Sequence, residues 1–203
     1  MCSERRAAAC AALALVGLWP GSALAHGLIP GANQFYVGLL HPLLAPAHVL
    51  ALLTLGLALG RGGDSRRDPS VLTLILGLMA GALLSVPLGD PGTDAALLAL
   101  AVGCALLTAG NRLGPRWLLA ALAGAVGLAV GLGSGDPAFT PQQRWVTMGG
   151  SLVGAFVIAG HTGFWTEALT ALRRLTHAVT AVRIGAAWLA AITLMLLGLT
   201  LRG

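Results

Sequence analysis

The side chains of this chain that can do chemistry are mainly histidines. Two of them, His41 and His48, lie in the apolar segment GLLHPLLAPAHVLALLTLGLALG at residues 38–60. An ionisable group within a membrane segment suggests a functional site, although a histidine can also link two helices by a hydrogen bond. Imidazole nitrogens suit Ni, Zn, Cu and Fe, so grouped histidines would bind a divalent transition-metal ion. The candidate metal ligands are His26, His41, His48 and His161.

Composition predicts the surroundings of these histidines. Hydrophobic residues make up 57% of the 203 residues, charged residues only 9%, and the mean hydropathy is +0.85. Because a soluble domain has about 25% charged residues, the chain is predicted to be an all-α integral membrane protein in a lipid bilayer. The net charge of +5 comes from arginine alone, and the arginines lie in short loops between apolar runs. This placement indicates membrane topology and argues against a nucleic-acid partner.

The first 25 residues have the three parts of a secretory signal peptide. A basic pair of arginines precedes an apolar run at residues 7–18, and an A-x-A motif ends at Ala25. Cleavage after Ala25 would make His26 the mature N-terminus, outside the cell membrane; an uncleaved first helix is the alternative. Residues 26–203 are then predicted to form a single six-helix transmembrane domain.

Six later apolar runs are long enough to cross a bilayer, which takes about 20 residues with a range of about 17–25. With His26 outside, the predicted inner loops hold eight arginines and the outer side holds two, as the positive-inside rule expects. Segment 166–182 either lies on the inner membrane surface or extends the fifth span. No Walker-type glycine loop occurs, which argues against a self-contained ATP-driven pump. The predicted spans lie near residues 36–60, 71–89, 94–110, 117–133, 145–164 and 183–201.

Four GxxxG pairs occur in the predicted spans. They begin at Gly56, Gly77, Gly127 and Gly150. Small residues at this spacing let helix backbones approach closely in lipid, so we expect these glycines to pack helices rather than to contact a ligand.

The spacing of the histidines limits how they can share an ion. On a regular helix, His41 and His48 lie about 10.5 Å apart along the axis, whereas ligand nitrogens lie about 2 Å from a bound metal. The two histidines are therefore expected to be successive stations, or each to pair with another segment. Counting residues places His48 about 18 Å, and His161 about 24 Å, from the outer ends of their spans. Neighbouring spans would let these two share an ion, while the N-terminal His26 would reach His41.

Pro42 and Pro46 alter the backbone of the same segment. Neither has an amide hydrogen, so the carbonyls of Gly38 and Pro42 lose their usual helical donors. In a membrane such carbonyls need a neighbouring helix, water or a cation. Broken helices with freed carbonyls recur at transporter ion sites, and a simple kink is the alternative.

The motif HPLLAPAHVLALLTLGL in the first predicted span, a signal peptide that ends before a histidine, and six spans together resemble the HupE/UreJ family. Its members are small membrane accessory proteins of hydrogenase and urease systems, regarded as nickel permeases. The family motif has the form H-P-x-x-G-x-D-H. His41, Pro42 and His48 match it, whereas Ala45 replaces the glycine and Ala47 replaces the aspartate.

The resemblance implies a permease for nickel, or a related divalent transition metal, in the bacterial inner membrane, with the mature N-terminus in the periplasm. In span five, AFVIAGHTG is similar to a family segment with a histidine near its end, so His161 carries over. The family's His-rich motif around span four corresponds here to GLAVGLGSGDP, which has no histidine. The site implied for this chain is therefore made of neutral histidines.

Two other functions compete with transport. The first is a non-transporting accessory or scaffold protein that works with maturation proteins of a hydrogenase or urease metallocentre. The second is an intramembrane hydrolase with Ser151 as nucleophile. His161, ten residues further along the same helix, would lie about 15 Å from Ser151, far beyond the roughly 3 Å of a nucleophile–base hydrogen bond. His48, on another helix, is the remaining candidate for the base, and an enzyme is not expected.

Overall fold

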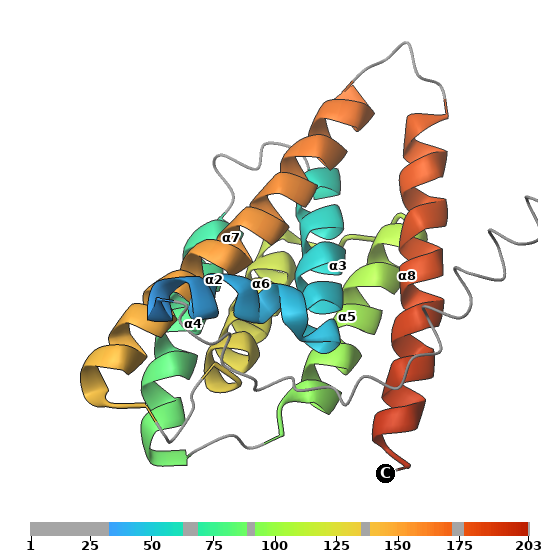
Figure 1. The fold of residues 1–203 in the computed structure, drawn as a ribbon. Coiled ribbons are helices and arrows are strands. Elements are labelled where there is room, and N and C mark those ends of the chain that lie inside the picture. Colours follow the sequence, from blue (N-terminus) through green and yellow to red (C-terminus); the bar gives the residue numbers. More distant parts are fainter. Residues whose placement is uncertain (1–32, 63–68, 89–91, 135–138, 172–176, 203) are drawn as a thin grey trace, which may run out of the picture.

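The computed structural model describes residues 33–62, 69–88, 92–134, 139–171 and 177–202, which form helices and turns and contain no strand (Figure 1). The predicted all-α class is confirmed for these residues. The predicted signal peptide and His26 lie outside them. The helices are α2 (Gln34–Leu44), α3 (Pro46–Gly62), α4 (Pro69–Leu88), α5 (Asp94–Ala109), α6 (Arg116–Leu132), α7 (Pro141–Ala171) and α8 (Ala178–Thr200).

Each predicted span coincides with a helix, except that the first is broken into α2 and α3. By length and apolarity, α7 and α8 can each cross a membrane, and α2 with α3 makes a third candidate if this pair, bent by 75°, is one span. Helices α4, α5 and α6 are apolar but shorter. Six complete spans therefore remain a prediction. Of segment 166–182, residues 166–171 continue α7 and residues 178–182 belong to α8. The first part therefore follows the second of the two alternatives, an extension of the fifth span.

Local sequence explains where the helices begin. The Asn33 side chain caps α2 by accepting a hydrogen bond of 3.1 Å from the backbone N–H of Phe35. At the start of α7, the Thr140 N–H donates to Gln143 Oε1 at 2.9 Å and the Gln143 N–H donates to Thr140 Oγ1 at 3.4 Å. This reciprocal pair is a capping box. Helices α3, α4 and α7 each begin with proline, whose fixed φ suits the first helical position.

Helix α3 lies at the centre of the bundle (Figure 1), where it contacts α5, α6, α7 and α8. Its side chains Ala51, Leu52, Leu55 and Ala58 are fully buried. The most extensive contact joins α4 to α6, and α2 packs mainly on α7. The core therefore lies around α3, and α2 lies across α7 at one side of it.

The glycine pairs lie at the closest helix contacts. A methyl group added at Gly56 would lie 2.7 Å from the Ala159 carbonyl oxygen, so α3 and α7 touch backbone to backbone. Gly77 and Gly81 of α4 lie in the same way against carbonyl oxygens of α6. The prediction that these glycines pack helices is confirmed.

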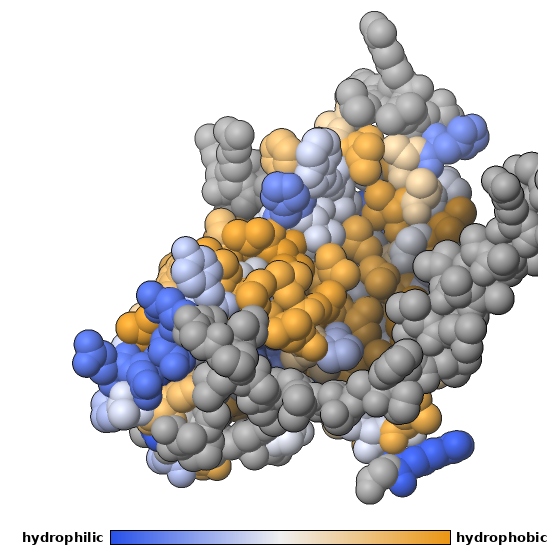
Figure 2. All heavy atoms as spheres, in the orientation of Figure 1, coloured by the Kyte–Doolittle hydropathy of each residue, from blue (hydrophilic) through white to orange (hydrophobic). Residues whose placement is uncertain are grey.

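The surface of the bundle is widely apolar. Figure 2 shows hydrophobic residues over the middle of the molecule and hydrophilic ones toward its ends. Large side chains such as Trp188 and Leu199 on α8 are mostly exposed. Soluble monomers rarely expose apolar areas of this extent, so this surface is suited to lipid.

Candidate metal site at the break between α2 and α3

The backbone breaks at Ala45, between the two histidines of the first predicted span. Ala45 has φ −93° and ψ 112°, an extended conformation, and Pro46 begins the next helix. A residue before proline is pushed out of the α-helical region by the proline ring. The Ala45 N–H still donates to the His41 carbonyl at 3.2 Å and so closes the last turn of α2. The two helices then diverge by 75°.

The break brings His41 and His48 together. Their ring centroids lie 5.1 Å apart, with the ring planes inclined by 71°. The expected separation along a regular helix is therefore wrong, because the segment is not one helix. Two imidazoles on one tetrahedral ion have centroids about 5 Å apart, since each nitrogen lies about 2 Å from the metal and about 1 Å from its ring centre. The observed spacing is suited to a shared ion.

His48 points to the end of α6. Its side chain is 3% exposed. A methyl group on Gly133, the residue that caps α6, would lie 3.0 Å from His48 Nε2 and 3.0 Å from Thr93 Oγ1. The carboxyl end of a helix carries a partial negative charge, so a cation beside His48 is favoured there. Sequence reasoning missed Thr93 and Gly133, because neither residue type nor spacing links them to the histidines.

One of the two freed carbonyls has a partner on another helix. Ser151 of α7 donates its hydroxyl to the Gly38 carbonyl at 3.1 Å. Beside this bond, Thr147 Oγ1 donates to Gln34 Oε1 at 3.3 Å. The need for a neighbouring helix, which the prolines predicted, is thus met at Gly38. Ser151 anchors α2 to α7 in this arrangement.

His161 does not join the pair. Its side chain is exposed on α7, and its ring lies against Trp165 with centroids 6.3 Å apart. The neighbouring residues Ala159 and Thr162 contact Gly56 of α3, which lies about 12 Å beyond His48 along that helix. His26 lies outside the described residues. Within the parts of the chain that the structure describes, no group of three or more His, Cys, Asp or Glu side chains converges.

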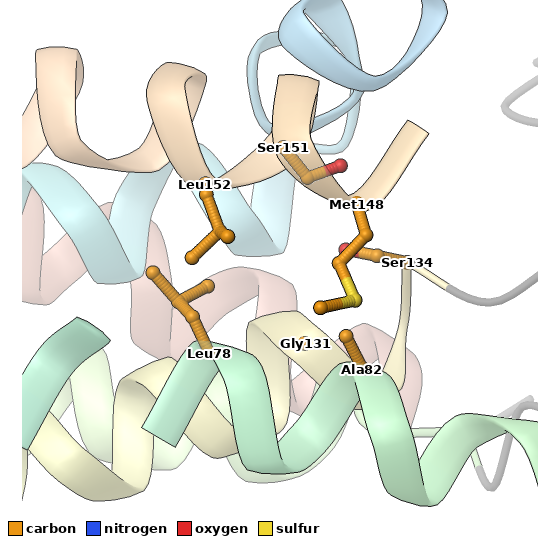
Figure 3. A pocket seen from close by; sticks show the side chains of 7 residues that line it. All are labelled: Leu78, Ala82, Gly131, Ser134, Met148, Ser151 and Leu152. Carbon is orange, nitrogen blue, oxygen red and sulfur yellow. The ribbon is translucent and has the colours of Figure 1, made fainter. Parts of the chain in front are cut away.

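A small crevice lies between α4, α6 and α7 (Figure 3). In it, Met148 and Ser151 of α7 face Ser134 at the end of α6. The Ser134 hydroxyl donates to the Val130 carbonyl at 2.7 Å, within its own chain segment. The remaining lining is mostly apolar, so the crevice does not extend the ligand set of the histidine pair. It is lined by Leu78, Ala82, Gly131, Ser134, Met148, Ser151 and Leu152.

Comparison with known proteins gives one match. The family model described as "HupE / UreJ protein" matches residues 13–198, which include every helix from α2 to α7 and most of α8. No curated protein and no solved structure matches the chain.

Proposed function

Because the chain belongs to the HupE/UreJ family, we propose that it is a membrane permease for nickel or a related divalent transition-metal ion. The family is linked to nickel and cobalt uptake or to hydrogenase and urease maturation. The observation that carries the proposal is the pairing of His41 and His48, whose ring centroids lie 5.1 Å apart. Imidazole pairs are suited to nickel, whereas Mg and Ca prefer oxygen ligands.

In this proposal the ion passes the break between α2 and α3. His26, through its imidazole and its α-amine, binds the ion first on the outer side. His41 and His48 then replace part of the water shell of the ion. Thr93 Oγ1 and the end of α6 offer oxygen atoms on the far side of His48. Ala47 stands where the family motif has an aspartate, so the site adds no negative charge. Weak binding suits conduction, which requires that the ion can also leave.

The remaining parts of the proposal concern placement. The protein lies in the bacterial inner membrane with six spans, a signal peptide removed after Ala25 and a periplasmic mature N-terminus. The apolar helices α7 and α8 and the bias of arginine between loops support this orientation. His161 is left out of the paired site because its exposed ring lies against Trp165.

Nickel uptake by vesicles that contain the purified protein tests the proposal. The double variant His41→Ala/His48→Ala is expected to lose most of the nickel uptake. It is also expected to show no saturable nickel binding in an isotherm. His161→Ala is the matched control, because it removes the same group from an exposed position. Uptake by the double variant equal to that of the original protein would reject the paired site.

A non-transporting accessory role is the second candidate. It is favoured by the lack of a third His, Cys, Asp or Glu beside the pair among the described residues, since an incomplete site can be completed by a partner protein. It predicts nickel binding without flux and co-purification with a metallocentre-maturation protein. Vesicle uptake and binding, measured on the same preparation, separate the two functions.

A further inference from the structure

A group of arginines surrounds the turn between α5 and α6. Arg61, from the last turn of α3, donates through Nη2 to Asn111 Oδ1 in this turn. Arg183, from α8, donates through Nε to the Ala109 carbonyl at 2.7 Å. Arg112 belongs to the turn itself and is exposed. Two helices far apart in the sequence and the turn between α5 and α6 thus place positive charge at one end of the bundle.

Backbone hydrogen bonds fix the conformation of the turn that the arginines surround. Asn111 has φ 55°, in the left-handed region, and its N–H donates to the Thr108 carbonyl at 3.2 Å. The Arg112 N–H donates to the Leu107 carbonyl at 3.0 Å. These bonds close the carboxyl end of α5. A cation near such an end is favoured by the helix dipole, which explains Arg183 but not the other arginines.

Two of these arginines have, in the part of the chain that the structure describes, no charged or hydrogen-bonding partner that would explain their position in the fold. The side chains of Arg112 and Arg116 are exposed, and neither side chain forms a hydrogen bond or ion pair within the described residues. Arg61 Nε, although buried, has no hydrogen-bond partner in the same part of the chain. Of the described acidic residues, Asp94 begins α5 at its opposite end, whereas Glu167 follows Thr166, which packs against Gly60 beside Arg61. The four arginines at this end of the bundle therefore outnumber its described carboxylates. Like charges gathered at one end of the bundle repel one another, so an external anion would stabilise the group.

Apolar side chains adjoin the same arginines. Trp117, next to Arg116 at the start of α6, is 69% exposed, and Ile184, next to Arg183 on α8, is 54% exposed. Tryptophan is enriched where a membrane protein meets the headgroup layer. Basic residues between helices bind the headgroups of anionic lipids. This combination is suited to a molecule that has an anionic head and an apolar tail.

We propose that the arginines around the α5–α6 turn, Arg61, Arg112, Arg116 and Arg183, bind the headgroup of an anionic phospholipid, whose acyl chains lie along the apolar surface beside Trp117. This site is at the end of α3 remote from His48, and it does not depend on metal transport.

Native mass spectrometry of the full chain in detergent tests the site, with phosphatidylglycerol and phosphatidylcholine of the same acyl chains as probes. We expect the chain to bind phosphatidylglycerol in preference to phosphatidylcholine. Arg112→Gln removes a charge without removing a hydrogen bond of the fold, and it is expected to weaken phosphatidylglycerol binding about fivefold. Arg202→Gln is the matched control, because Arg202 is exposed beyond the opposite end of α8.

Three results would overturn the proposal. The first is equal binding of the two lipids. The second is an equal loss in the Arg112→Gln and Arg202→Gln variants, which would indicate a general charge effect. The third is displacement of phosphatidylglycerol by inorganic phosphate at the same concentration, which would assign the arginines to free anions. Unchanged phosphatidylcholine binding by Arg112→Gln confirms that the variant is folded.

Discussion

Replacement of Gly150 by alanine is expected to separate α2 from α7. A Cβ atom at this position would lie 2.7 Å from the backbone nitrogen of Leu39, and it would overlap the carbonyl oxygen of Phe35. Both obstacles are backbone atoms, so no side chain can rotate away to make room. Relief requires α2 to move as a body, and α2 carries His41.

The adjacent Gly149 supplies a matched control, because a Cβ there meets no atom within 4 Å. Both alanine variants gain about 0.5–1 kcal/mol from replacing glycine within a helix. This gain cancels when Gly150→Ala is compared with Gly149→Ala. The difference between their free energies of unfolding therefore isolates the packing cost, which is about 1–3 kcal/mol for an overpacked contact.

Two measurements on each variant check this reasoning. Denaturant unfolding in detergent gives the difference in stability, and a nickel-binding isotherm gives the effect on the histidine pair. Gly150→Ala is expected to lower both stability and nickel affinity, and Gly149→Ala neither. Equal stability of the two variants would refute the close contact. If the two variants differ in stability but bind nickel with the same affinity, the packing of α2 on α7 does not position His41.

Three further changes test single contacts. Ser151→Ala leaves the Gly38 carbonyl without its donor and is expected to lower the free energy of unfolding by about 1–3 kcal/mol. Gly133→Ala places a methyl group 3.0 Å from His48 Nε2, so the isotherm is expected to report weaker nickel binding. Ala47→Asp buries a carboxylate beside His48, which should lower the melting temperature without metal and raise it again when nickel is added; no effect of nickel would contradict the proposed site.

The prolines of the first predicted span indicated a disturbed helix, but they did not indicate that His41 and His48 would come together. Pro42 and Pro46 indicated two freed carbonyls, and the Gly38 carbonyl does take its donor from another helix. The size of the bend was not predictable, because it depends on the contact of α2 with α7. Without knowledge of that contact, the seven-residue spacing of His41 and His48 predicted successive stations or a separate partner for each histidine, whereas the two rings lie together.

The predicted depth of His48 failed for the same reason. Counting from Tyr36 assumed that every residue adds about 1.5 Å toward the other side. The residues of α2 run across the bundle instead, and His48 is only the third residue of α3. His161 lies beside Ala159 and Thr162, which contact Gly56, about 12 Å or two turns beyond His48 along α3. The glycine pairs, in contrast, correctly predicted close helix packing, because the approach of two helix backbones depends on the size of the residues at the contact.

Helix α7 spans the break that divides α2 from α3. Its first half holds α2 through Gly150 and Gly154, and its second half holds α3 through Ala159 and Gly163. Helices α2 and α3 have few direct contacts with each other. The separation of the two imidazoles is therefore expected to depend on the straightness of α7 between Gly154 and Ala159 as well as on the backbone at Ala45. A bend there is expected to change the distance between His41 and His48 in the proposed metal site, although neither histidine is part of α7.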